Sequence, residues 1–486
     1  WSLLKEFGHA EIASLVAPRS LIIEHSAAPK VDGAPAPRGG ARNVAAPGRI
    51  TTPEFLTVET EAGRAKQLSG KFADSIHFLH GAEGTVVAPG SPRALEEFLK
   101  ALGTGVAKLD PAGPTPVDAR KDFAPTERQR RTVKELENFT QALLQVCERT
   151  RAANFWGTIR ATNAADWEAT RPKFKQQFWE DVIGKWTNAV LPFNPRSRPA
   201  LSATNGAPLP VGAKGCKNYD VVLDVFPDVY AWGVLVLPAD LKPGERRPVV
   251  VCQHGLEGLP EDCVTQDQKG RAFQYYKGFA TALAERGFVT FAPHNPYRGQ
   301  DAFRQLQRKS NPLGKTLFST IVAQHDRILE WLAAQPFVDP RRIAFYGLSY
   351  GGKTAKRVPA LLDRYCLSIG SGDFNEWVRK NASTDYFSSY LFAPEYEIFE
   401  WDLGHTYNYA EMAALIAPRP FMVERGHFDG VGSDEWVNYE YARVRRFYAQ
   451  LGIADRTEIE HFWGPHTIHG EGTYEFLHKH LNWPKR

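Results

Sequence analysis

Arg342-Ile-Ala-Phe-Tyr-Gly-Leu-Ser-Tyr-Gly-Gly-Lys353 is the stretch of sequence that decides the fold. Ile343 to Tyr346 is a short apolar run of β-forming residues, which Gly347 ends. Lys353 to Leu362 is compatible with a helix. A strand, a G-x-S-x-G turn and a helix are the context of a nucleophile elbow, where glycines leave room beside the serine. The pattern predicts that Ser349 is a nucleophile at the positive end of the following helix.

The composition is that of a globular protein with two or three folded units. The chain has 486 residues, of which 43% are hydrophobic and 23% charged. Its formal net charge is +4 without a block of Lys and Arg, so we expect no nucleic-acid partner. No apolar run approaches the roughly 20 residues of a membrane span, and we expect no membrane partner. The five cysteines form no CxxC pair, which argues against a disulfide framework.

Two segments near the start of the chain are repeated near its end. Glu11 to Glu24 aligns without a gap with Glu411 to Glu424, and seven of the fourteen positions are identical. Further on, Ser75 to Gly81 resembles Glu458 to Gly464. In both copies a predicted helix follows. Segments of helix, Pro and strand look alike in many α/β proteins, but these identities favour a true repeat.

The repeat predicts an incomplete first copy. We expect residues 1–105 to be the C-terminal half of a degenerate α/β unit that begins before Trp1, and residues from about 215 to be a complete copy. Glu83 stands where His466 stands in the second copy, and Lys30-Val31-Asp32 matches the second acid loop only loosely. We therefore expect the first copy to be a structural or interaction domain, which pairs with the missing N-terminal part of a tandem protein.

Between the copies, residues 106–214 are predicted to be a linker and a helical segment. Pro111 to Pro125 is rich in Pro, Ala and Asp, which is typical of a linker. Thr126 to Arg151 has apolar residues at helical spacing, and a second helix is expected over Ala165 to Trp186. Thr187 to Gly215 is rich in Pro, Gly and Asn, and should be irregular.

The segment 215–486 alternates apolar strands with amphipathic helices. Pro248 to Gln253 and Phe288 to Pro293 are apolar throughout, as in strands that are buried on both faces. Helices are expected over Lys269 to Arg286 and Lys315 to Gln335. The pattern predicts an α/β fold with a mostly parallel, doubly covered sheet that begins with an antiparallel pair.

The loop after a late strand carries the expected catalytic acid. A serine hydroxyl attacks only if a base removes its proton and an acid orients that base. In the elbow fold the acid follows the serine in the chain, and the histidine comes last. Asp429 lies on the loop after the predicted strand Phe421 to Glu424. Glu424 itself and Asp434 are the alternatives.

The loop after the last strand carries the expected base. His466 is the first histidine after the predicted strand Thr457 to Phe462, and His469 is the alternative. A loop histidine is usually solvated and an Asp beside a Gly is usually a turn residue. Three such residues in the right order on the right loops nevertheless predict a triad of Ser349, Asp429 and His466.

The oxyanion hole is predicted from two backbone amides. One is the N–H of Tyr350, directly after the serine, and the other is that of Leu256, on the loop after Pro248 to Gln253. The alternative is that His254-Gly255 forms a plain strand-to-helix turn.

The insert from Phe374 to Trp401 contains nine aromatic residues in 28 positions. It is predicted either to form a cap whose rings stack on a sugar or an aromatic acyl group, or to build an ordinary core for a long insert. Trp377 and Trp401 of the insert, together with Lys353 of the elbow, are the candidate substrate-binding residues. The histidines at 405, 427, 461, 466 and 469 lack ligand spacing, so no metal or other cofactor is predicted.

From about residue 215 to 483 the chain resembles α/β-hydrolases of the acetyl xylan esterase and dienelactone hydrolase-like group, which is related to prolyl oligopeptidase catalytic domains. The stretches that carry the resemblance are HGLEG (254–258), GLSYGGK (347–353), ERGHFDGV (424–431) and GPHTIHG (464–470). Lys353 is also similar to the elbow lysine of glucuronoyl esterases, which have an arginine where this chain has Tyr350. The resemblance implies an α/β-hydrolase fold and a serine triad, and leaves the substrate open.

The expected function is that of a serine carboxyl-ester hydrolase. Its substrate would be a small-molecule or polysaccharide ester, such as an acetyl or feruloyl ester of plant or algal carbohydrate. The alternatives are a peptidase or amidase of the prolyl oligopeptidase type, for which no 40–50-residue blade repeat is visible, and a non-catalytic scaffold. The compartment is left open, with a secreted or periplasmic location favoured.

Overall fold

The computed structural model describes residues 1–30, 50–105, 108–121, 123–202, 205–386, 389–392 and 400–485. The chain divides into two compact units. One consists of residues 1–134 and 311–314, and the other of residues 135–310 and 315–486.

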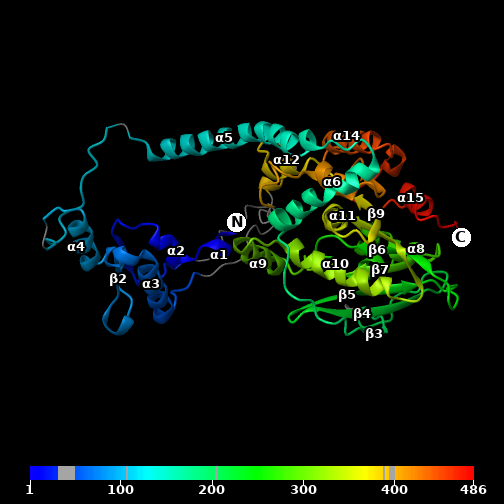
Figure 1. Ribbon diagram of the computed structural model, residues 1–486, viewed down its shortest axis with the longest axis horizontal. Helices are drawn as coiled ribbons and strands as arrows, with labels where there is room; N and C mark the ends of the chain where they lie inside the picture. Colours follow the sequence, from blue (N-terminus) through cyan, green and yellow to red (C-terminus); the bar gives the residue numbers. More distant parts are fainter. Residues whose placement is uncertain are drawn as a thin grey trace. The chain divides into compact units, whose positions relative to one another are not determined.

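The second unit is built around a sheet with the strand order β11-β10-β9-β8-β6-β7-β5-β4-β3 (Figure 1). The strands from β11 to β7 are parallel, and β5, β4 and β3 continue the sheet in antiparallel pairs. This is the strand order of the α/β-hydrolase fold, and it confirms the predicted fold class. The strands span β3 Arg196–Pro199, β4 Lys217–Phe226, β5 Val229–Leu237, β6 Arg247–Gln253, β7 Val289–Pro293, β8 Val338–Leu348, β9 Tyr365–Ser371, β10 Phe421–Gly426 and β11 Thr457–Phe462.

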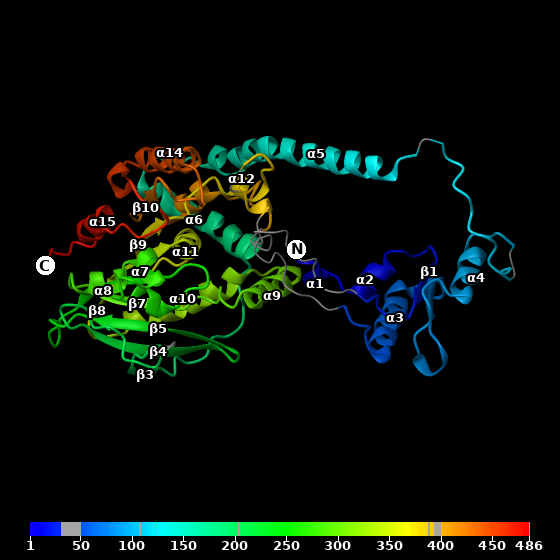
Figure 2. The ribbon, with the colours of Figure 1, turned by 180° about the vertical axis from the view of Figure 1, so that it is seen from behind.

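Helices cover both faces of this sheet (Figures 1 and 2). In β6, Val249 and Val251 belong to one core while Val250 and Cys252 belong to the other, because side chains alternate along a strand. The first core lies under α6 (Ala164–Gln177), α10 (Leu317–Ala333), α11 (Tyr350–Leu361), α13 (Tyr409–Ile416) and α14 (Asp434–Gln450). The second lies under α7 (Arg271–Tyr276), α8 (Phe279–Ala284) and α15 (Gly472–His480).

Several elements differ from the sequence prediction. The helix expected over Lys269 to Arg286 is broken into α7 and α8, because Lys277 and Gly278 both adopt positive φ, at 53° and 57°. The stretch expected to be irregular contains β3, which pairs with β4. Helix α9 (Asp301–Ser310) was not predicted.

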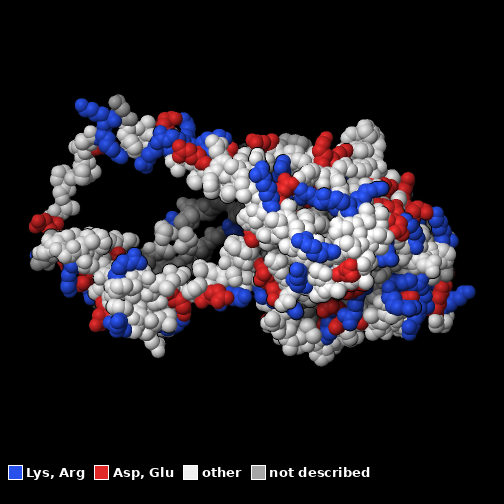
Figure 3. All heavy atoms as spheres, turned by 45° about the horizontal axis from the view of Figure 1, so that its top comes forward, with Lys and Arg blue, Asp and Glu red and all other residues white. Residues whose placement is uncertain are grey.

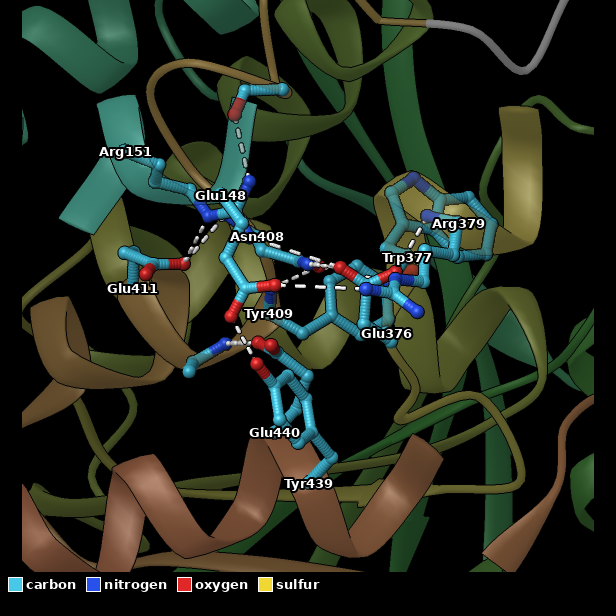
Figure 4. Close-up of polar contacts among 12 residues, drawn as sticks. Glu148, Arg151, Glu376, Trp377, Arg379, Asn408, Tyr409, Glu411, Tyr439 and Glu440 are labelled. Atoms are coloured by element: carbon cyan, nitrogen blue, oxygen red, sulfur yellow. Dashed lines mark hydrogen bonds and ion pairs between the residues drawn. The ribbon is translucent and has the colours of Figure 1, made fainter. Parts of the chain in front are cut away.

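Helix α5 (Pro125–Asn154) carries a buried arginine into a cluster of acidic side chains of the second unit (Figure 4). The Arg151 guanidinium lies 3.8 Å from Glu376 and 3.5 Å from Glu411, and donates a hydrogen bond of 2.7 Å to the Gly404 carbonyl. Burial, and then the carboxylates of Glu411 and Glu376, raise the pKa of Glu440 well above its ordinary value. Arg151 thus supplies positive charge where three acids are buried.

The first unit contains a two-stranded parallel sheet of β1 (Leu21–Glu24) and β2 (Ile76–Leu79). Its helices are α1 (Leu3–Glu6), α2 (His9–Ser14), α3 (Phe55–Ser69) and α4 (Pro92–Ala101). Of the loose match Lys30-Val31-Asp32 to the acid loop, only Lys30 lies within the described residues.

Charged side chains of both signs lie on the molecular surface. On the face that Figure 3 shows, Lys and Arg are interspersed with Asp and Glu. Within the described ranges, none of the helices combines the length and the apolar character that crossing a bilayer requires.

Candidate active site

Ser349 lies between the end of β8 and the start of α11 in a strained backbone conformation. Its φ is 63° and its ψ is −121°, a region that L-residues rarely adopt. A Cβ on Gly347 would lie 2.6 Å from the carbonyl carbon of Gly351, and one on Gly351 would lie 2.9 Å from the His254 carbonyl oxygen. The turn therefore needs both glycines, as the G-x-S-x-G pattern predicted, and it leaves Ser349 half-buried.

Asp429 and His466 lie in contact on neighbouring loops. His466 Nδ1 is 2.7 Å from Asp429 Oδ2, and the exposed fractions of the two side chains are 22% and 1%. The other Asp429 oxygen accepts a hydrogen bond of 2.9 Å from the Val431 amide. A carboxylate held in this way orients the imidazole and leaves Nε2 available to take a proton.

Ser349 and His466 both lie beside the segment that ends β9. The Ser349 amide donates a hydrogen bond of 2.9 Å to the Ser371 carbonyl, and Gly372 follows directly. A Cβ on Gly372 would lie 2.8 Å from His466 Nδ1 and 2.9 Å from the side chain of Leu348. The ring of His466 thus lies beside the residue that adjoins the elbow. All three predicted triad residues gather at one edge of the sheet.

The alternative base, His469, has other partners. Its Nδ1 lies 2.7 Å from Glu460, and its ring stacks on Phe462 with 4.4 Å between the centroids. The geometry therefore supports His466 as the base. Among the described residues, no three His, Cys, Asp or Glu side chains converge as metal ligands would.

The alternative acids are also engaged elsewhere. Asp434 pairs with His427 at 2.6 Å and with Arg425 at 2.9 Å. Glu424 is fully buried within β10 and accepts hydrogen bonds from the hydroxyls of Ser371 at 2.5 Å and Tyr346 at 2.9 Å. Burial raises the pKa of Glu424.

The loop after β6 passes directly beside the serine. A Cβ on Gly255 would lie 2.9 Å from Ser349 Cβ. The amides of Gly255, Glu257 and Gly258 all donate to acceptors within the protein. The Leu256 amide donates to no acceptor in the part of the chain that the structure describes. Leu256 therefore stays a candidate oxyanion donor, and Tyr350, the other predicted donor, is the first residue of α11, directly after the serine.

His254, for which the sequence predicted no role of its own, holds this loop in place. It is fully buried, and its Nε2 accepts a hydrogen bond of 3.3 Å from the Asn295 amide. Its carbonyl accepts one of 2.5 Å from the Tyr297 hydroxyl. Burial, and then the nearby His294, lower the pKa of His254 to about 3, so the ring is neutral at neutral pH. Its position directly after an apolar strand was the signal in the sequence.

The three predicted substrate-binding side chains lie in different environments. Trp377 is 1% exposed and stacks on Tyr409 with 5.0 Å between the centroids. Lys353 is also buried, with its Nζ 4.9 Å above the Trp377 ring and 3.8 Å from Glu400. These contacts give Trp377 and Lys353 a packing role instead of a surface for ligand. Trp401 is 51% exposed. Residues 387–388 and 393–399 of the aromatic insert lie outside the described ranges.

The comparisons with known proteins agree with this fold. No family model matches the chain. "Putative hydrolase YtaP" of Bacillus subtilis (strain 168) is 24% identical over 214 residues, which are 43% of this chain and 69% of that protein. A solved structure described as a "putative acetyl xylan esterase" from Bacteroides fragilis NCTC 9343 is similar, with a TM-score of 0.50, 15% identity, and 66% of this chain and 81% of that chain covered.

A glucuronoyl esterase from Solibacter usitatus is also similar, with a TM-score of 0.45, 17% identity, and 66% of this chain and 94% of that chain covered. The strand order and the likeness to the Bacteroides fragilis structure show that this chain has the α/β-hydrolase fold, as the sequence resemblance predicted.

Proposed function

We propose that this protein is a serine carboxyl-ester hydrolase. The observation that carries the proposal is the 2.7 Å contact between Asp429 and His466 beside the strained elbow of Ser349. A nucleophile, a base and an orienting acid at one sheet edge are the parts that acyl transfer requires.

In the proposed reaction, Ser349 Oγ attacks the ester carbonyl while His466 Nε2 takes the hydroxyl proton. Asp429 stabilises the imidazolium that forms, and the amides of Tyr350 and Leu256 stabilise the oxyanion. The bond from the carbonyl carbon to the leaving oxygen then breaks, and His466 returns its proton to the departing alcohol. Water, deprotonated by His466, cleaves the acyl-enzyme and releases the carboxylic acid.

Acyl esters of carbohydrates are the proposed substrates, in particular acetyl or feruloyl esters. The sequence resemblance to acetyl xylan esterases supports this class, and the Bacteroides fragilis protein of similar fold carries that description. Trp401 presents an exposed ring on which a sugar could stack. A secreted or periplasmic location follows as part of the proposal, because esterified polysaccharides do not enter cells.

The test is the hydrolysis of p-nitrophenyl acetate by paired variants. Ser349→Ala, His466→Ala and Asp429→Asn should each lower kcat by at least about 10³-fold. The matched variants His469→Ala and Asp434→Asn should keep kcat within about 3-fold, since those side chains do not contact the triad. Full activity of Ser349→Ala would refute the mechanism and favour a scaffold.

Two further measurements test for the acyl-enzyme and for the type of bond that is cleaved. A burst of p-nitrophenol equal to the enzyme concentration would reveal the acyl-enzyme. Parallel assays on acetylated xylan, feruloylated xylan and a p-nitroanilide should show ester cleavage without amide cleavage. Preferential hydrolysis of the anilide would favour a peptidase or amidase.

A further inference from the structure

The two copies of the repeat share three side-chain contacts. In each contact a backbone amide donates to a carboxylate at a matching position. The distances in the first copy are 2.8, 2.9 and 2.8 Å, and those in the second copy are 2.8, 2.9 and 3.0 Å. The pairs are Gly8–Glu11 with Asn408–Glu411, Ala10–Glu61 with Ala410–Glu440, and Gly90–Glu24 with Gly470–Glu424.

The elements between these contacts follow one another in the same order. Helix α2, strand β1, helix α3, strand β2 and helix α4 correspond to α13, β10, α14, β11 and α15. Both strand pairs are parallel. Leu21 lies opposite Ile76 in the first strand pair, and Phe421 lies opposite Thr457 in the second. Because Leu21 aligns with Phe421, Ile76 corresponds to Thr457 in the structure. The sequence comparison had aligned Ile76 with a position two residues further on. The described residues 8–30 and 50–102 therefore repeat the element order of the second half of the larger sheet unit.

Strand β1 differs from β10 in what lies on its other edge. β10 is flanked by β9, whose segment donates backbone hydrogen bonds to the carbonyls of Pro420 at 3.1 Å and Glu424 at 3.2 Å. Among the described residues β1 pairs only with β2. The His25 amide donates a hydrogen bond to Leu79 of β2. In a parallel strand the backbone groups of successive residues point to opposite edges, so those of Ile22 and Glu24 point to the edge away from β2.

The helix that leads into β1 shows the same difference. Ile12 and Leu15 of this segment are 41% and 68% exposed. Their counterparts Met412 and Leu415 are both 0% exposed, in the core to which α11 and α13 contribute. The exposed apolar positions of the first copy thus correspond to buried positions of the second copy, which a strand and a helix cover there.

We propose that β1 binds a parallel strand of the β9 kind, accompanied by a helix of the α11 kind, from an α/β-hydrolase half that precedes α2 in the same polypeptide. The order of the repeat assigns this source, because β9 and α11 precede α13 in the chain. The partner would complete a fold rather than a second active site, since no histidine occurs between Gly81 and Ser91 to match His466. This inference is independent of the proposed esterase activity.

The test extends the full chain with its own complementary half. Residues 217–407 are repeated directly ahead of residues 8–486, and amide hydrogen exchange is compared with that of the chain 1–486. We expect the amides of Ile22 and Glu24 to exchange at least about ten-fold more slowly in the longer polypeptide. The amide of Ile23, which faces β2, should change much less.

Two variants and one mass measurement make the test decisive. Ile22→Pro in the longer polypeptide should remove the slowing at Glu24, because proline lacks the donor that the partner strand needs. Gly370→Pro in the repeated half should do the same from the other strand. Unchanged exchange in the longer polypeptide would overturn the proposal. Slow exchange of the Ile22 and Glu24 amides in the monomeric chain 1–486 would also overturn it. The same holds if these amides exchange slowly in the chain 1–486 and light scattering shows that this chain is a dimer.

Discussion

At the scale of single residues, two glycines determine how closely the neighbouring loops approach Ser349 and His466. Gly255 brings the loop with the Leu256 amide against Ser349, and Gly372 lets the His466 ring lie beside Leu348. Neither glycine takes part in the proposed chemistry. Their missing side chains are nevertheless part of the site, because any Cβ would occupy space that the serine or the histidine needs.

Replacing Gly372 with alanine should therefore impair catalysis without unfolding the protein. The new methyl group would lie 2.8 Å from the imidazole, which must move, and we expect kcat on p-nitrophenyl acetate to fall by about 10²-fold. Gly452→Ala is the matched control, since Gly452 also has a positive φ but has no atom within 4 Å of a Cβ. If both variants lost activity equally, backbone strain and not the clash would be the cause.

The loops that carry the proposed triad residues could be predicted from sequence, because each loop follows the end of a strand in a fixed order. Ser349, Asp429 and His466 are all at the positions that their loops indicated. The burial of Trp377 and Lys353 could not be predicted, because it depends on how the aromatic insert packs against α11. A tryptophan looks the same in sequence whether it stacks on a sugar or on a tyrosine.

At the scale of elements, Glu424 joins strand β10 to the loop that carries the histidine. Its carboxylate accepts hydrogen bonds from the amides of His469 at 3.2 Å and Gly470 at 3.0 Å. Glu424→Gln would replace the carboxylate that accepts these hydrogen bonds with a neutral side-chain amide. We therefore expect the free energy of unfolding to fall by about 2 kcal/mol and kcat to fall about ten-fold. Thermal denaturation and the ester assay measure the two effects.

Glu24→Gln provides the control, because Glu24 makes the corresponding contacts with Gly90 and Ser91 in the first unit. It should leave kcat unchanged. A Glu424→Gln variant with normal kcat would show that this contact does not position His466.

Helix α12 (Trp377–Ala382) carries a lysine whose titration should be visible in stability. Burial lowers the pKa of Lys380 to about 8, although the Asp373 and Asp429 carboxylates oppose the shift. Between about pH 8 and 10 the unfolded lysine binds a proton that the folded one has released, so this group makes stability rise with pH.

Lys380→Met should remove that rise. We expect the Tm difference between pH 9.5 and pH 7 to become at least about 2 °C less positive than in the parent protein. The exposed Lys269→Met variant should leave the difference unchanged. An unaltered difference in Lys380→Met would mean that Lys380 titrates normally in the folded protein.

The strands and most helices of the second unit could be predicted because their hydrophobic patterns are long and regular. The break between α7 and α8 could not, since Lys277 is an ordinary helix former that adopts φ 53° here. Strand β3 was also missed, because Arg196–Pro199 is polar and exposed, and only its pairing with β4 makes it a strand. Tertiary contacts decide such segments.

At the scale of the whole molecule, the division into two units predicts how the chain responds to a protease. Lys108, Arg120 and Lys121 are exposed in the segment between α4 and α5. Limited trypsin digestion should cut there and release a fragment of residues 122–486. The proposed triad lies wholly within that fragment, so the kcat of the fragment should stay within about 2-fold of that of the intact chain. Loss of activity on cleavage would assign the first unit a part in the reaction.

The arginine that α5 inserts among Glu376 and Glu411 limits how far this protein can be shortened from its N-terminal side. A version trimmed to the hydrolase sheet, starting near residue 215, would leave those acids in a dry interior with their cation gone. Losing one member of such a buried group costs about 3–5 kcal/mol, a large share of what keeps a domain folded. The shortest version that behaves well should therefore begin close to residue 135, which keeps the part of α5 that carries Arg151.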